Sequence, residues 1–180
     1  DWARQEAAHR TARDTSLEAL AFPEGEFRSG QRDLAEAVYR AASGGRCLVA
    51  QAPTGIGKTV GTLFPALRAM PRRGIDKLAY LTCKGTGRIT ALEALNGLRA
   101  STARTPGAAD PGLRVLTIVP KEEGCAHPDK ACHGDDCPLA SGFYDRLPAA
   151  RQEAVASGWL DVATQRDIAL RHRVCPYYLG

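Results

Sequence analysis

The spacing of apolar residues predicts helices that alternate with short strands over the first two thirds of the chain. Apolar positions recur at helical spacing in four segments, which are 1–20, 29–44, 59–70 and 90–99. Short apolar runs between these segments predict buried strands at 46–50, 77–82 and 114–119. Strands that alternate with helices in this way are typical of a parallel sheet covered by helices. We therefore expect an α/β fold.

The pattern changes after Pro120, where turn residues and cysteines replace the alternation. Four cysteines fall in this part, and two helical patterns follow at about 145–156 and 161–172. We expect three parts: a helical extension over 1–20, an α/β domain over 21–119 and a small, mostly helical module over 120–180.

Composition indicates a folded protein outside the membrane. The 180 residues are 44% hydrophobic and 24% charged, which is ordinary for a globular chain long enough for one domain and a small module. There is neither an apolar run of the roughly 18 residues that a membrane span needs nor a secretory signal at Asp1, so we expect a cytoplasmic protein. In that compartment six cysteines favour metal binding or buried thiols over disulfides.

The net charge of +4 is unevenly distributed along the chain. Residues 1–120 hold 17 of the 24 Lys and Arg against 11 of the 20 Asp and Glu, and residues 121–180 hold the other 7 and 9. The basic excess lies ahead of the cysteine module. This balance permits a nucleic-acid partner without requiring one.

A glycine-rich segment between a predicted strand and a predicted helix has the pattern of a phosphate-binding loop. It reads Ala52, Pro53, Thr54, Gly55, Ile56, Gly57, Lys58, Thr59. Gly55 and Gly57 allow backbone N–H groups to face phosphate oxygens, and the helix that follows presents its positive end. Lys58 would reach the β and γ phosphates, and Thr59 would bind Mg²⁺. The alternative is a glycine-rich turn that only resembles the motif.

Polar residues on both sides of this loop suggest what the nucleotide is used for. Upstream, Phe27-Arg28-Ser29-Gly30-Gln31 places a glutamine whose amide offers the donor and the acceptor that an adenine edge requires. By itself, Gln31 is as well explained by a solvated helix position.

Downstream, the second predicted strand ends in a small, polar and basic turn, 82–88. Ligands bind at the strand ends of parallel sheets, and hydroxyl and cationic groups there can hold a nucleic-acid backbone. The candidate DNA contacts are Thr82, Lys84, Thr86 and Arg88. An exposed loop with two cations is the simpler alternative.

The four cysteines of the C-terminal module suggest a metal centre. Cys125, Cys132, Cys137 and Cys175 follow the spacing Cys-x6-Cys-x4-Cys-x37-Cys, and four thiolates can hold zinc or an iron–sulfur cluster. The paired Cys-x2-Cys common in zinc modules is missing, which favours a cluster. His127 and His133 could serve a zinc site, but four cysteines already complete the coordination. We expect Cys47 and Cys83, in predicted strands, to be buried apolar residues instead.

Taken together, these segments resemble the XPD/DinG family of iron–sulfur superfamily 2 DNA helicases, and the bacterial DinG-like branch in particular. The resemblance covers about residues 22–180. It rests on the Phe-Arg-x-Gly-Gln element, the phosphate loop, the Leu-Thr-x-Lys-x-x-Gly-Arg turn and the late Cys-Pro-Tyr-Tyr, with 137–145 favouring the DinG-like branch.

The resemblance implies a RecA-like motor domain that binds ATP and Mg²⁺, with a cluster domain inserted in it. The four cysteines of the module would hold a [4Fe-4S] cluster. The full-length enzyme would move 5′ to 3′ on single-stranded or forked DNA, as a monomer.

The family's Asp-Glu-x-His motif and second motor domain are not found in these residues. Phosphoryl transfer needs the metal held and a water positioned, so we expect the 180 residues alone to bind ATP weakly and not to hydrolyse it. Two alternatives remain open: a zinc-stabilised nucleic-acid adaptor with a nucleotide-sensing loop, and a small P-loop kinase.

Overall fold

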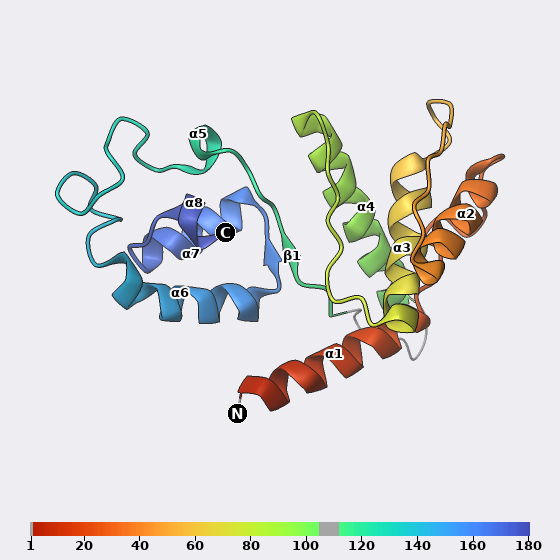
Figure 1. Ribbon diagram of the computed structural model, residues 1–180, viewed down its shortest axis with the longest axis horizontal. Coiled ribbons are helices and arrows are strands. Elements are labelled where there is room, and N and C mark those ends of the chain that lie inside the picture. The colour runs from red at the N-terminus through yellow and green to blue at the C-terminus, as the bar shows by residue number, and fades with distance from the viewer. Residues whose placement is uncertain (1, 105–111) are drawn as a thin grey trace. The chain divides into compact units, whose positions relative to one another are not determined.

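A computed structural model describes residues 2–104 and 112–180 (Figure 1). The chain divides into two compact units, 1–112 and 113–180, and each is described by itself. The described residues are mostly helical and contain a single sheet of two short parallel strands. None of their helices is long and apolar enough to cross a membrane. The domain boundaries expected at 20 and at 119 stay predictions.

Four helices build the first unit, and each corresponds to a helix expected from the sequence. They are α1 (Trp2–Glu18), α2 (Gln31–Gly44), α3 (Lys58–Arg73) and α4 (Gly85–Arg104). Glycines with positive φ end two of them: Gly45 ends α2 and Gly74 ends α3. An L-residue rarely adopts this left-handed conformation, so glycine is the residue that stops a helix here. Helix α4 begins five residues earlier than expected.

Helix α3 is the centre of the first unit, because α1, α2 and α4 all pack against it. Leu63 lies in an apolar cluster with Ala91 and Ala94 of α4. In the C-terminal half of α3, the Arg68 guanidinium donates to the carbonyl oxygens of Glu18, the last residue of α1, and of Leu20. Contacts with α1, α2 and α4 hold α3 in place. They therefore also hold its N-terminus, where the phosphate loop ends.

Two of the expected strands do not form. Segments 46–50 and 77–82 have no strand partner within the described residues, and Val49 and Leu81 are 99% and 90% exposed. Cys47 and Cys83 are exposed too, so the expectation that they are buried is wrong. A strand needs a neighbour for its backbone hydrogen bonds and a layer to cover its apolar side chains. The first unit is therefore helical.

The second unit contains the remaining elements. They are β1 (Val115–Leu116), α5 (Lys121–Gly124), α6 (Phe143–Ser157), β2 (Trp159–Leu160), α7 (Val162–Arg171) and α8 (Pro176–Leu179). The helices expected at 145–156 and 161–172 are confirmed. The strand expected at 114–119 is reduced to two residues, which pair in parallel with β2.

The core of the second unit lies between α6, α7 and α8. Leu147 and Ala150 of α6 pack with Ile168 and Ala169 of α7, and Val174 and Leu179 close the cluster. Asp161 begins α7, where its carboxylate accepts a 2.8 Å hydrogen bond from the Thr164 N–H, and this bond lowers the pKa of Asp161. This core anchors the segment that carries the last cysteine.

Candidate nucleotide site and cysteine centre

The phosphate loop joins segment 46–50 to helix α3, and two of its glycines adopt backbone conformations that other residues avoid. Gly55 has φ 89° and Gly57, the N-cap of α3, has φ 79°. A Cβ on Gly57 would lie 2.3 Å from the Gln31 side-chain nitrogen, whereas a Cβ on Gly55 would meet nothing within 4 Å. Gly55 is thus required for conformation alone, and Gly57 for conformation and for space.

Lys58 lies over the loop that precedes it. Its ammonium donates to the carbonyl oxygens of Pro53, at 2.8 Å, and Ala52, at 3.2 Å. The side chain is exposed, and it belongs to the first turn of a 16-residue helix whose free N–H groups favour an anion. Phosphate oxygens could replace these two carbonyls as acceptors without a change of backbone.

Gln31 holds the loop from helix α2. It is fully buried; its Oε1 accepts from the Arg28 N–H at 3.0 Å, and its Nε2 donates to the Gly57 carbonyl at 3.2 Å. An amide has two donor hydrogens and two acceptor lone pairs, so one of each remains after these bonds. The structure therefore gives Gln31 a supporting contact with the loop that the sequence did not suggest.

Arg28 makes a second contact with the loop that sequence reasoning missed. Its guanidinium donates to the Gly55 carbonyl at 3.0 Å and pairs with the Glu24 carboxylate at 3.3 Å. The sequence could have indicated this contact, because Arg28 belongs to the same Phe-Arg-x-Gly-Gln element as Gln31. Aromatic packing holds this element against α3. The ring centroids of Phe22 and Phe27 lie 4.1 Å apart, and the Phe22 ring contacts the Phe64 ring of α3.

Thr59 borders a groove of about 440 Å³ on the side of the loop that faces helix α4. Thr90 and Glu93 of α4 and Glu24 contribute polar groups to its lining. The volume is in the range of small-molecule pockets. This open groove lies beside the residue expected to bind Mg²⁺.

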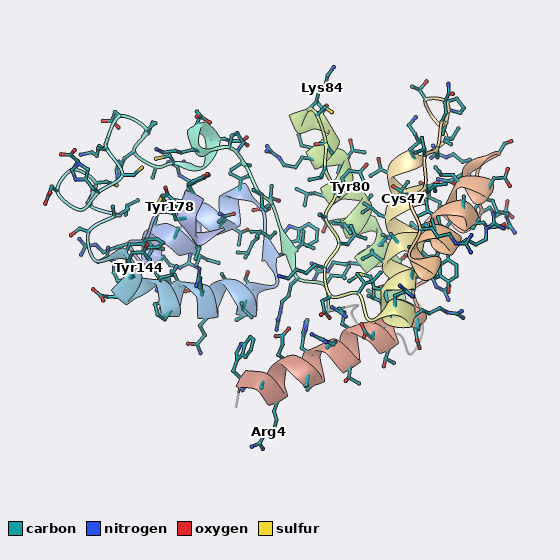
Figure 2. All side chains as sticks on the ribbon, viewed as in Figure 1. Arg4, Cys47, Tyr80, Lys84, Tyr144 and Tyr178 are labelled. Carbon is teal, nitrogen blue, oxygen red and sulfur yellow. The ribbon has the colours of Figure 1, made fainter. Side chains whose placement is uncertain are left out.

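The predicted DNA-binding residues lie where α4 begins. Figure 1 shows α3 and α4 starting at the same end of the unit, which brings the loop and this turn to one side. The Thr82 hydroxyl donates to the Lys84 carbonyl at 3.0 Å, and Thr86 and Arg88 fall in the first turn of the helix. The Lys84 side chain extends outward from the tip (Figure 2). A cation beside a helix N-terminus favours phosphate binding.

Two of the four cysteines pack together in the second unit. Cys137 and Cys175 are buried in one cluster with Leu139, against which Phe143 and Tyr177 pack. Burial raises the pKa of the Cys175 thiol, hydrogen bonds from the Tyr178 and Tyr177 backbone oppose this, and nearby Cys125 and Cys137 raise it further. Cys125 and Cys137 therefore both affect the Cys175 thiol.

Cys132 lies on an exposed turn and interacts with Lys121 of α5. A hydrogen bond to Cys132 is the main cause that raises the pKa of Lys121, and Cys125 contributes to the same shift. His133 faces the carboxylate of Asp136, at 3.1 Å. Within the described residues no three Cys, His, Asp or Glu side chains lie close enough together to bind a metal ion.

Four cysteines are the residue type that a four-thiolate group requires, but of these four, which all lie in the described part of the chain, only Cys137 and Cys175 pack together in this conformation. The main partner of Lys121 is Cys132, which lies outside helix α5, so helical spacing did not indicate this contact in advance. When bound, a cluster would supply folding energy to a segment with little apolar core.

Comparison of the chain with protein-family models, with curated proteins and with solved structures gives no match.

Proposed function

We propose that this chain is the ATP-binding and iron–sulfur part of a cytoplasmic DNA helicase with a RecA-like motor domain. The observation that carries the proposal is the geometry of the phosphate loop. Two glycines with positive φ precede a long helix, and Lys58 lies over carbonyl oxygens that phosphate could replace. A nucleotide triphosphate with Mg²⁺ is the ligand that such a loop suits.

The basic turn at the start of α4 supports the nucleic-acid part of this proposal. It lies at the same end of the unit as the phosphate loop (Figure 1), and hydroxyl and cationic groups occur together there. In a motor, contacts with ATP and with DNA have to be near each other so that one can alter the other. The four cysteines would hold a [4Fe-4S] cluster in the second unit.

Nucleotide binding is the first test. A fluorescent ATP analogue should bind the 180-residue chain weakly, and Lys58→Ala should weaken binding by about 10- to 150-fold, the usual effect of losing a charge-assisted hydrogen bond. Lys77→Ala, at another exposed lysine, should leave affinity unchanged. Equal affinity in the wild type and Lys58→Ala would contradict the proposal. Steady-state ATP hydrolysis stimulated by DNA would contradict the expectation that these residues lack part of the active site.

Metal analysis is the second test. The anaerobically purified protein should contain iron and acid-labile sulfide, and Cys137→Ser should lose both while Cys47→Ser keeps them. Cys47 is exposed and belongs to the other unit, so it is the matched control. One zinc ion and no sulfide would support the nucleic-acid adaptor instead.

A further inference from the structure

Four aromatic rings from two helices meet at one end of the second unit. Phe143 and Tyr144 begin α6, and Tyr177 and Tyr178 belong to α8. The Phe143 ring lies against two of the three tyrosines: its centroid is 5.4 Å from that of Tyr144 and 6.3 Å from that of Tyr178. Tyr177 and Tyr178 are 5.0 Å apart. All of these contacts are edge-to-face, the arrangement that aromatic pairs favour.

The inner two rings are fixed and the outer two are open. Phe143 and Tyr177 are half-buried and pack against the cluster of Cys137 and Cys175. Tyr144 is 82% exposed and Tyr178 is 53% exposed (Figure 2). Large exposed aromatic side chains held by a packed layer beneath them lose little freedom on binding, so they suit a ligand with a flat face.

The charges around these rings restrict the ligand. Lys121 belongs to α5, which packs against α8, the helix that carries Tyr178. Asp145 follows Tyr144, and residues 121–180 carry 7 basic against 9 acidic side chains. Duplex DNA, whose bases are already stacked and whose affinity comes mainly from phosphate contacts, is a poor match for this surface. The unstacked bases of a single strand offer flat faces that can stack on exposed rings, while a nearby cation contacts the backbone.

We propose that Tyr144 and Tyr178 form a stacking surface for the bases of single-stranded DNA, with Lys121 placed to contact a phosphate. This inference rests on the proposed function, because it assumes that the chain binds DNA. It adds a second contact area to the turn at the start of α4, and in this area stacking on the bases is the main contact.

The test uses the full 180-residue chain and a single-stranded oligonucleotide that contains the fluorescent base 2-aminopurine. Tyr144→Ala and Tyr178→Ala should each weaken binding by about 5- to 150-fold, the effect expected for loss of one base–aromatic stack. Tyr144→Phe and Tyr178→Phe keep the ring and should bind like the wild type. Trp2→Ala is the matched control, since Trp2 is an exposed aromatic residue of the first unit.

A second probe separates stacking from charge. An oligonucleotide of the same length in which abasic sites replace the bases keeps every phosphate, and its binding should not respond to Tyr144→Ala or Tyr178→Ala. Lys121→Ala should make the slope of log affinity against log salt concentration shallower by about 0.7. This is the value for one phosphate contact of a single strand.

The outcomes distinguish this inference from the proposed function. If the chain binds the oligonucleotide and neither alanine variant changes the affinity, the stacking surface is refuted and DNA binding stands. If neither oligonucleotide binds, both fail. If the alanine variants lose binding to a proline-rich peptide and not to DNA, the surface is a protein-docking site and the inference is wrong.

Discussion

The side-chain amide of Gln31 donates to the carbonyl oxygen of Gly57, at 3.2 Å, and so ties helix α2 to the end of the phosphate loop. The same amide accepts from the Arg28 N–H. A buried glutamine in this position connects three segments: the aromatic element, the loop and α3.

Gln31→Ala should destabilise the protein and weaken nucleotide binding. The change removes both hydrogen bonds, each worth about 0.5–1.5 kcal/mol, together with a fully buried side chain. Urea unfolding measures the loss. Gln5→Ala, at an exposed glutamine, should unfold at the same concentration as the wild type.

The affinities of Gln31→Ala for ATP and for GTP distinguish two roles of Gln31. If Gln31 supports the loop, Gln31→Ala weakens ATP and GTP binding by the same factor. If it also reads adenine with its remaining donor and acceptor, the loss is greater for ATP. An unchanged stability together with unchanged affinity would contradict both roles.

Gly57→Ala should be more harmful than Gly55→Ala. Both glycines have positive φ, where an L-residue costs about 1–2 kcal/mol, so this penalty is shared. A Cβ on Gly57 also meets the Gln31 amide, while a Cβ on Gly55 has open space. The free energies of unfolding of the two variants measure the difference. Equal destabilisation would show that the Gln31 contact does not restrict Gly57.

Arg173→Gly should stabilise the second unit. Arg173 has φ 54° and is the sole non-glycine residue with positive φ in the described ranges. Relief of that strain, partly offset by the greater freedom of glycine in the unfolded chain, should gain about 0.5–1 kcal/mol. The Arg173 carbonyl, which accepts from Arg146 at 2.8 Å, is retained.

Thermal unfolding of Arg173→Gly is the measurement, and Arg173→Ala is its control. Alanine removes the same side chain and keeps the strained backbone, so it should give no gain. A gain of equal size in both variants would assign the effect to the side chain instead of the backbone.

Glu153 should make the second unit sensitive to acid. Hydrogen bonds from Arg171, and then from His172, hold the pKa of this carboxyl below its ordinary value. A depressed folded pKa contributes stability above the unfolded pKa, and that stability is lost as the pH falls through the folded pKa. Because the group is exposed, solvent screening keeps the effect small.

Glu153→Gln should therefore be less stable than the wild type at neutral pH, and the two should converge as the pH falls below the ordinary glutamate pKa. Chemical unfolding at a series of pH values follows this. Glu36→Gln, an exposed change in the first unit, should show a constant difference from the wild type. A difference between wild type and Glu153→Gln that persists in acid would exclude the ionised carboxylate as its source.

Helices were predictable from the sequence because their signals are local. The apolar spacing indicated α2 and α3, and the structure ends them at Gly45 and Gly74. The start of α4 was missed because Gly85-Thr86-Gly87 has the composition of a turn, yet it continues as helix. Strands depend on a partner, so the apolar run that contains Val49 could not indicate whether it would pair.

The candidate sites, too, depend partly on adjacent residues and partly on residues far apart in the chain. Conformation and charge within the predicted phosphate loop are properties of adjacent residues, so the sequence could indicate them. The approach of Cys175 to Cys137 depends on how α6, α7 and α8 pack, and spacing could not supply that. Likewise, the meeting of Tyr144 and Tyr178 at Phe143 joins positions far apart in the chain.

The exposed segments 46–50 and 77–82 also affect how the protein behaves at high concentration. Each carries apolar side chains, such as Val49 and Leu81, on backbone without a strand partner in the described part of the chain. Exposed apolar edges of this kind can pair with the same segment of another molecule. Aggregation through strand pairing between molecules should therefore limit the solubility of the protein. A charged substitution such as Val49→Lys should raise that solubility.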